Sequence, residues 1–136
     1  MPINTFNPYL RGDILRMTAD SCGRLVVPEP LEDQLAVFQP GGARAFTVQP
    51  QSNSVCRLRY PAGVTCDAAD NIYVADLGHN RVSKFTSTGV FVASTLTAGQ
   101  HGLFNPHDVH LSARNQLLYS HVSARHLRVF CFSDAA

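Results

Sequence analysis

The sequence has no tryptophan, a single lysine and few charged residues of either sign. Charged residues make up 15% of the 136 residues, the formal net charge is +1, and 45% of the residues are hydrophobic. A chain with so little charge and so much apolar character is not disordered. A net charge near zero also gives no general attraction to nucleic acid, so we expect a folded domain that does not bind DNA.

Cysteines at metal-ligand spacing are absent as well. The four cysteines are Cys22, Cys56, Cys66 and Cys131, and no two of them form a CxxC motif. We expect reduced thiols, with Cys66 as a small core residue on a strand. The N-terminus lacks the apolar run of a signal peptide, and no segment is long enough to cross a bilayer. We therefore predict a cytoplasmic chain with no metal, no cofactor and no membrane contact.

What the sequence does contain is one residue pattern repeated at a spacing of about 46 residues. The middle copy is the most complete and runs from Pro61 to Val92. Its Phe85 recurs 47 residues earlier as Phe38 and 45 residues later as Phe130. A fixed period of this length indicates one supersecondary unit that is repeated and stacked side by side.

Each copy predicts a four-stranded antiparallel meander. In the middle copy, short apolar runs rich in Val, Ile, Tyr and Phe are separated by turn residues at 70–71 and 88–89, which favours strands over helices. The strands are apolar on both faces, as Val82 and Phe85 illustrate, so each sheet needs a neighbour on both sides. We predict an all-β fold, a partial β-propeller of about three four-stranded blades. A β-sandwich would have the same strands but would not require a fixed period.

The middle copy resembles the NHL repeat. The string Asn-Ile-Tyr-Val-Ala-Asp-x-Gly-His-Asn-Arg-Val-x-x-Phe at residues 71–85 carries the resemblance, together with Pro-x-Gly-Val at 61–64. The outer copies depart from it, since Glu29 and His121 stand where the middle copy has Asp76. The resemblance implies an NHL-type propeller, commonly with six blades, and is greatest to the C-terminal half of a tripartite-motif NHL protein.

The blades are expected at about residues 11–50, 58–98 and 104–136, the last without its outer strand. Three blades are half of the ring that the resemblance implies, so we expect two outer faces with uncovered apolar side chains. A second half-propeller would complete the ring. The chain has no RING or B-box spacing, so any ubiquitin-ligase activity would lie outside it.

The candidate binding residues are those that a propeller would present at one end. Loops between second and third strands emerge there together with the linkers that lead into each blade. Arginine, histidine and aromatic side chains in such loops suit phosphates and unstacked RNA bases. The expected RNA- or partner-binding residues are Arg57, Arg59, Tyr60, His79, Arg81, His107 and Arg125.

Several tripartite-motif NHL proteins bind single-stranded or hairpin RNA on this surface, so the resemblance makes RNA binding and post-transcriptional repression the leading hypothesis. The alternative is a scaffold that presents protein substrates to a ubiquitin-ligase module. Arg81 also has a structural interpretation, because it can pair with Asp76 across the loop as a clamp. Phe38, Phe85 and Phe130 are expected at equivalent core positions.

A catalytic function has little support in the sequence. Some NHL-like propellers are zinc-dependent amidating lyases with histidines along the central channel, for which His107 and His121 are the candidates here. No complete ligand set stands out, and the chain has no nucleophile–base motif or phosphate-binding loop. We therefore expect a non-catalytic recognition module.

Overall fold

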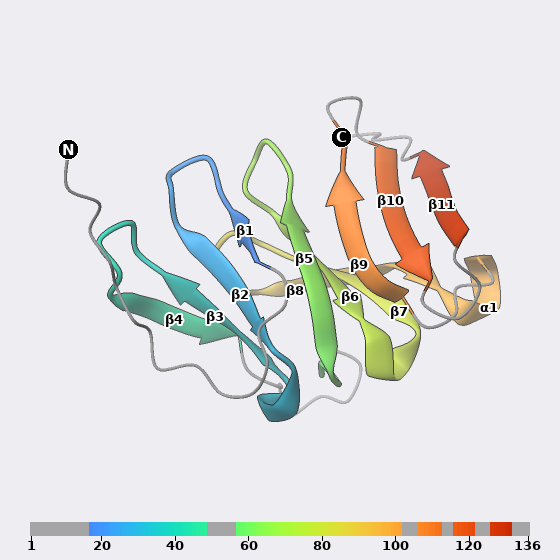
Figure 1. The fold of residues 1–136 in the computed structure, drawn as a ribbon, viewed down its shortest axis with the longest axis horizontal. Helices are drawn as coiled ribbons and strands as arrows, with labels where there is room; N and C mark the ends of the chain where they lie inside the picture. Colours follow the sequence, from blue (N-terminus) through green and yellow to red (C-terminus); the bar gives the residue numbers. More distant parts are fainter. Residues whose placement is uncertain (1–16, 49–56, 102–105, 113–115, 122–125, 132–136) are drawn as a thin grey trace.

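The computed structural model describes residues 17–48, 57–101, 106–112, 116–121 and 126–131, and almost all of them lie in β-strands or tight turns. The strands form three antiparallel sheets that stand side by side along the molecule (Figure 1). One short helix, α1 (Ala98–His101), follows the second sheet. None of the described helices is long and apolar enough to cross a bilayer. The predicted all-β fold is confirmed.

The strands follow one another in each sheet in chain order, as a meander. The first sheet has the order β1-β2-β3-β4 and consists of β1 (Thr18–Ala19), β2 (Leu25–Glu29), β3 (Gln34–Phe38) and β4 (Arg44–Val48). The second has the order β5-β6-β7-β8 and consists of β5 (Pro61–Cys66), β6 (Ile72–Asp76), β7 (Arg81–Phe85) and β8 (Phe91–Thr97). In the third, the described strands are β9 (Pro106–Leu111), β10 (Gln116–His121) and β11 (His126–Cys131).

The 47-residue period of the sequence is repeated in the backbone of the first two sheets. Asp20 and Asp67 each accept, through one carboxylate oxygen, the amides of the residues two and four positions later. Gly42 (φ 99°) and Gly89 (φ 90°) both take the left-handed conformation in the hairpin before the outer strand, which a residue with a Cβ adopts at a cost. The repeat therefore encodes turn geometry as well as apolar spacing.

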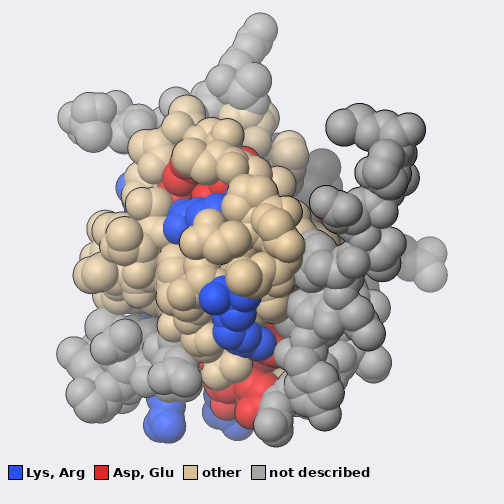
Figure 2. Space-filling view, turned by 90° about the vertical axis from the view of Figure 1, so that its left-hand side faces the viewer, with Lys and Arg blue, Asp and Glu red and all other residues tan. Residues whose placement is uncertain are grey.

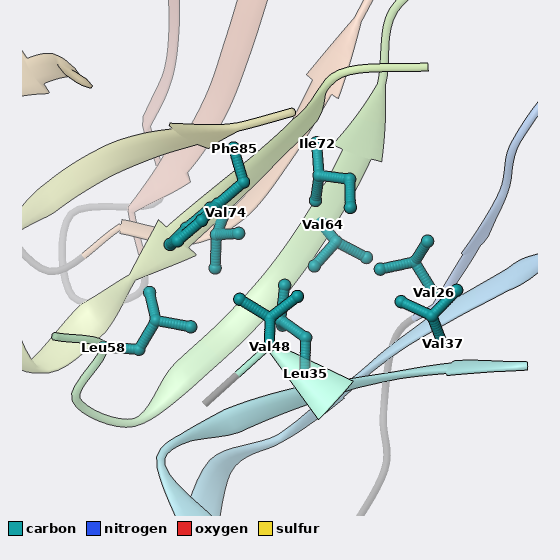
Figure 3. Packing of buried hydrophobic residues seen from close by; sticks show 9 residues of the cluster. All are labelled: Val26, Leu35, Val37, Val48, Leu58, Val64, Ile72, Val74 and Phe85. Carbon is teal, nitrogen blue, oxygen red and sulfur yellow. The ribbon is translucent and has the colours of Figure 1, made fainter. Parts of the chain in front are cut away.

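Among the described residues, the largest buried cluster lies between the first and second sheets (Figure 3). Its buried residues are Val26, Leu35, Val37 and Val48 from the first sheet, Val64, Ile72, Val74 and Phe85 from the second, and Leu58 from the linker between them. The Phe85 ring also meets the Phe91 ring edge-to-face, with 5.6 Å between centroids. Both sheets therefore contribute to one shared core, as neighbouring propeller blades do.

The opposite face of the second sheet packs against the third. Val82, which points away from Phe85, belongs to a second buried cluster that includes Val109 of β9. The innermost strands β5 and β9 approach closely: the Leu111 amide donates to Thr65 Oγ1 at 3.3 Å, and a Cβ on Gly63 would lie 2.8 Å from the Asp108 Cα. The prediction that the strands are covered on both faces is confirmed for this sheet.

The outer face of the first sheet corrects one expectation. Val27, Ala36 and Phe38 lie on the face turned away from the second sheet, yet their side chains are buried in a cluster of their own. The expectation that a three-blade piece leaves its apolar side chains uncovered is therefore wrong for this face. The side chains of β10 and β11, including Phe130, lie outside the described residues.

Replacing Phe85 by alanine tests the shared core. Phe85 is 1% exposed and contacts both the inter-sheet cluster and Phe91, so we expect Phe85→Ala to lower the free energy of unfolding by roughly 3–5 kcal/mol. Val92→Ala is the control, because Val92 is half exposed on the outer strand β8, and should change stability by less than about 0.5 kcal/mol. Chemical denaturation measures both. Equal effects of the two changes would contradict the packing of the first two sheets.

Candidate functional site

Three short segments meet at one end of the first two sheets, the lower end in Figure 1. They are the linker 57–60 and the two 3₁₀ turns, Pro30–Glu32 before β3 and Leu77–His79 before β7. The Gly78 amide donates to the Arg59 carbonyl at 2.8 Å, and the Tyr60 amide donates to Asp33 Oδ1 at 2.8 Å. We call residues 30–33, 57–60 and 77–81 the loop face. The linker and the second-to-third-strand loops lie together here, as the propeller interpretation expects.

The loop face is built on a buried carboxylate. Asp76, at the end of β6, is 0% exposed. Its Oδ1 accepts the Arg59 amide at 2.8 Å, and its Oδ2 lies 2.8 Å from both His79 Nδ1 and Arg81 Nε. A carboxylate removed from water needs such partners, and these partners come from the linker, the 3₁₀ turn and the next strand. One side chain therefore fixes three segments.

Arg81 belongs to this clamp and is not a surface cation. Its side chain is only 12% exposed. Beyond Asp76, its guanidinium donates to the Arg57 carbonyl and to Ser94 Oγ, at 3.3 Å for the latter, and lies over the Phe91 ring. The contacts of Arg81 therefore match its predicted role as a clamp with Asp76. Little of its side chain is exposed for contact with a partner.

The first sheet holds an equivalent clamp with different residues. Glu29 stands 47 positions before Asp76 and is also buried. Gln34, in place of Arg81, donates its side-chain amide to Glu29 Oε1 at 2.9 Å, and Arg44 Nη1 lies 3.4 Å from the same oxygen. The substitution of Glu29 for aspartate looked like a departure from the repeat, but the longer side chain still finds a partner. The two carboxylates share one feature that is visible in the sequence, which is their position at the end of the second strand of each sheet.

Several side chains of the loop face remain exposed. Leu31 is 69% exposed and Tyr60 is 43% exposed. Arg57 and Arg59 are exposed too, and their guanidinium groups make no hydrogen bond or ion pair among the residues that the structure describes. Glu32 adds an exposed acidic residue on the neighbouring turn. The surface thus combines an aromatic and an aliphatic side chain with charges of both signs.

The charge on the flank of the molecule is mixed as well. Figure 2 looks at the left-hand side of Figure 1, and basic and acidic groups lie beside one another there within a largely uncharged surface. No broad basic area is visible on this flank outside the atoms drawn in grey. This flank therefore presents no broad basic surface to a phosphate backbone outside the atoms drawn in grey.

The remaining predicted site residues are less informative. His79 is one-third exposed at the edge of the loop face, where its ring contacts Asp76. His107 is half-buried on β9. Arg125 and the side chain of His121 lie outside the described residues. Of the predicted binding residues, those that lie at the loop face are therefore Arg57, Arg59, Tyr60, His79 and Arg81.

The opposite end carries an acidic group that the sequence analysis did not anticipate. Potential ligand atoms of Asp20, Cys22 and Asp70 lie within 4.8 Å of one another. Asp70, however, accepts both the amide and the hydroxyl of Ser21, at 2.9 and 2.6 Å. Burial alone would raise the pKa of Asp20, but its hydrogen bonds and ion pair with Arg24 outweigh this and hold the pKa below its ordinary value. Asp70 therefore joins the tips of two hairpins and Asp20 fixes the turn of its own hairpin, which are structural roles.

A cavity of about 570 Å³ lies on the inner side, between β1, β5 and β9, and Thr65, Cys66, Asp108 and His110 are among the residues that line it. Burial, reinforced by the nearby carboxylates of Asp20, Asp70 and Asp67, raises the pKa of the Cys66 thiol to about 12. The thiol is therefore protonated at neutral pH and is a poor nucleophile. Cys22 and Cys66 are both free thiols, as predicted.

The clamps of the two sheets give a matched mutational test. Asp76→Ala leaves the buried Arg81 guanidinium without its carboxylate, so we expect a loss of about 3–5 kcal/mol in the free energy of unfolding. Glu29→Ala leaves an uncharged glutamine amide, and Arg44 is more exposed than Arg81, so the loss should be about 1–3 kcal/mol. Denaturant titrations of the two variants decide the order. A larger loss for Glu29→Ala would contradict the role assigned to Arg81.

Comparison with known sequences identifies one repeat. The model of the NHL repeat family matches residues 58–85, which include Arg59, the Asp76 clamp and Phe85. No curated protein matches the sequence significantly.

Comparison with solved structures supports the architecture. Similar structures include a streptogramin B lyase (TM-score 0.61, 15% identity, 90% of this chain covered) and virginiamycin B lyase from Staphylococcus aureus (TM-score 0.60, 14% identity, 90% covered). A protein from Bacteroides fragilis has a TM-score of 0.70 at 14% identity over 95% of this chain. This chain spans 42% of the length of each lyase and 37% of the Bacteroides protein. At these identities the likeness concerns the fold alone. The chain therefore contains an NHL repeat and has the fold of a partial β-propeller.

Proposed function

We propose that this chain is part of a non-catalytic recognition module that binds a protein partner at its loop face. The observation that carries the proposal is the composition of that face, which exposes Tyr60, Leu31, an acidic residue and two arginines whose guanidinium groups have no partner among the described residues. Aromatic residues and arginine dominate the energetics of protein–protein interfaces, where they are surrounded by a polar rim.

The loop face contains internally held residues and exposed side chains, and this combination supports the proposed function. Asp76, Arg81 and the backbone of Arg59 are held in internal contacts, so they give the surface a fixed shape. The side chains of Arg57, Arg59 and Tyr60 project from that framework and are exposed. A rigid surface with exposed anchors binds at a lower entropic cost than a flexible loop.

The similarity to streptogramin-type lyases adds no activity to this proposal, because it rests on fold. In a longer protein the same face could hold a substrate for a ubiquitin-ligase module. The resemblance to tripartite-motif NHL proteins is the argument for that context.

Capture of partners by the full chain tests the loop face. We expect proteins retained by the wild type, in the presence of nuclease, to be lost with Arg59→Gln, because glutamine keeps the Cβ and Cγ that pack against Gly78 and removes the guanidinium. Lys84→Gln is the matched control: it also removes one positive charge, but Lys84 lies over the Tyr73 ring toward the other end of β7. Quantitative mass spectrometry compares the three samples. Equal loss with both variants would speak for nonspecific charge effects and against the proposal.

RNA binding is the second candidate, and it is favoured by the exposed Tyr60 ring together with Arg57 and Arg59, whose guanidinium groups have no partner among the described residues. Arginine and an aromatic ring are the combination that holds single-stranded RNA by phosphate contacts and base stacking. Its weakness is the acidic residue on the same face and the engagement of Arg81 within the clamp.

A salt series with a fluorescent uridine-rich RNA tests this candidate. Each phosphate contact should contribute about −0.7 to the slope of log affinity against log salt. The double variant Arg57→Gln/Arg59→Gln should therefore flatten the slope by about 1.4 if both residues contact phosphates. An unchanged slope would remove these residues from an RNA site, while a retained affinity without salt dependence would exclude phosphate contacts altogether.

A further inference from the structure

The backbone at Tyr60 has an unusual conformation. Four non-glycine residues in the described part of the chain have positive φ: Asp33, Tyr60, Asp70 and Asn80. Aspartate and asparagine tolerate this left-handed region, whereas a bulky aromatic residue rarely adopts it. Tyr60, at φ 51°, also precedes Pro61, and the residue before a proline normally takes an extended conformation. The position is thus strained for two separate reasons.

Contacts from both sheets hold Tyr60 in this conformation. Asp33 of the first sheet accepts the Tyr60 amide, and Asp76 of the second accepts the amide of the preceding Arg59, both at 2.8 Å. The Arg59 carbonyl is held in turn by the Gly78 amide. The peptide bond that precedes the strained residue is therefore held by contacts from both sheets before any partner arrives.

The strained conformation of Tyr60 is not compensated by packing in a described core cluster. Tyr60 is 43% exposed, and it belongs to none of the three buried clusters found in the described residues. Glycine would satisfy the backbone without strain. A strained residue that the surrounding structure enforces, and that faces solvent, indicates a functional role.

We propose that Tyr60 is the anchor of the loop face and that it receives an extended peptide segment carrying a carboxylate next to an apolar side chain. This inference rests on the protein-binding function proposed above and names the chemistry of the partner. The apolar side chain packs on the exposed Tyr60 ring, and the carboxylate pairs with Arg57 or Arg59, whose guanidinium groups have no acidic partner among the described residues. Arginine binds carboxylates through two parallel hydrogen bonds, which orients the segment. Asp33 acts as a positioning residue through the Tyr60 amide.

The strain is measured first, without any ligand. Tyr60→Gly and Tyr60→Ala both remove the ring, but only glycine relieves the left-handed conformation. We expect the glycine variant to melt a few degrees above the alanine variant. Equal melting temperatures would mean that the backbone is not strained, and would overturn this step of the inference.

Peptide selection then tests the anchor. A phage library of random dodecapeptides is panned on the full chain, and binding of the enriched peptides is measured by fluorescence anisotropy. We expect enriched sequences with Asp or Glu beside Leu or Phe, an affinity at least tenfold lower with Tyr60→Gly, and little change with Tyr60→Phe. Asp33→Gly should also weaken binding, because it removes the acceptor and keeps the left-handed backbone, and Asp33→Asn should restore it.

The outcomes separate this inference from the proposed function. Peptides that need Arg59 but bind Tyr60→Gly as well as the wild type would overturn the anchor and leave the protein-binding function intact. Enrichment of basic peptides would overturn the partner chemistry. No enrichment on the wild type would count against both proposals. Uridine-rich RNA binding that depends on Tyr60 would assign the anchor to RNA and overturn the peptide partner.

Discussion

The buried carboxylate of Asp76 is the interaction on which the loop face depends. A charge that is fully removed from water destabilises a fold unless it is paired and hydrogen-bonded. Here the partners are the Arg59 amide, the His79 ring and the Arg81 guanidinium, and Arg81 extends the network to the Arg57 carbonyl. Because the buried Asp76 carboxylate needs these partners, it fixes the position of the linker 57–60, which carries the exposed residues.

In this arrangement, the residues that hold the loop face together differ from the side chains that it exposes to solvent. The residues that satisfy the clamp are held in internal contacts, whereas the side chains of Arg57, Arg59 and Tyr60 face solvent. The first sheet keeps the framework with Glu29 and Gln34, so the clamp tolerates different chemistry provided that a buried acceptor meets a donor. The exposed positions are under no such constraint, and they are free to be matched to a partner.

The fold could be predicted from the sequence in most of its parts. Short apolar runs, turn residues and a 47-residue period specify the meanders of the first two sheets, and apolar residues on both strand faces require neighbouring sheets. The candidate site was predicted less completely. The loops that meet and the core position of Phe38 were anticipated, but the pairing of Glu29 with Gln34 and the positive φ of Tyr60 were not. Each of these depends on contacts between segments far apart in the chain.

The sequence by itself determined the strands, their turns and their two apolar faces, because these follow from local residue preferences and a period that repeats them. Only the tertiary structure decided which charged residues are available to a partner. Arg57, Arg59 and Arg81 lie within one stretch of the sequence, yet Arg81 is held at a buried carboxylate while the other two have exposed guanidinium groups. The difference arises because burial and pairing are set by the approach of β6, β7 and the linker, and that approach exists only in the folded chain.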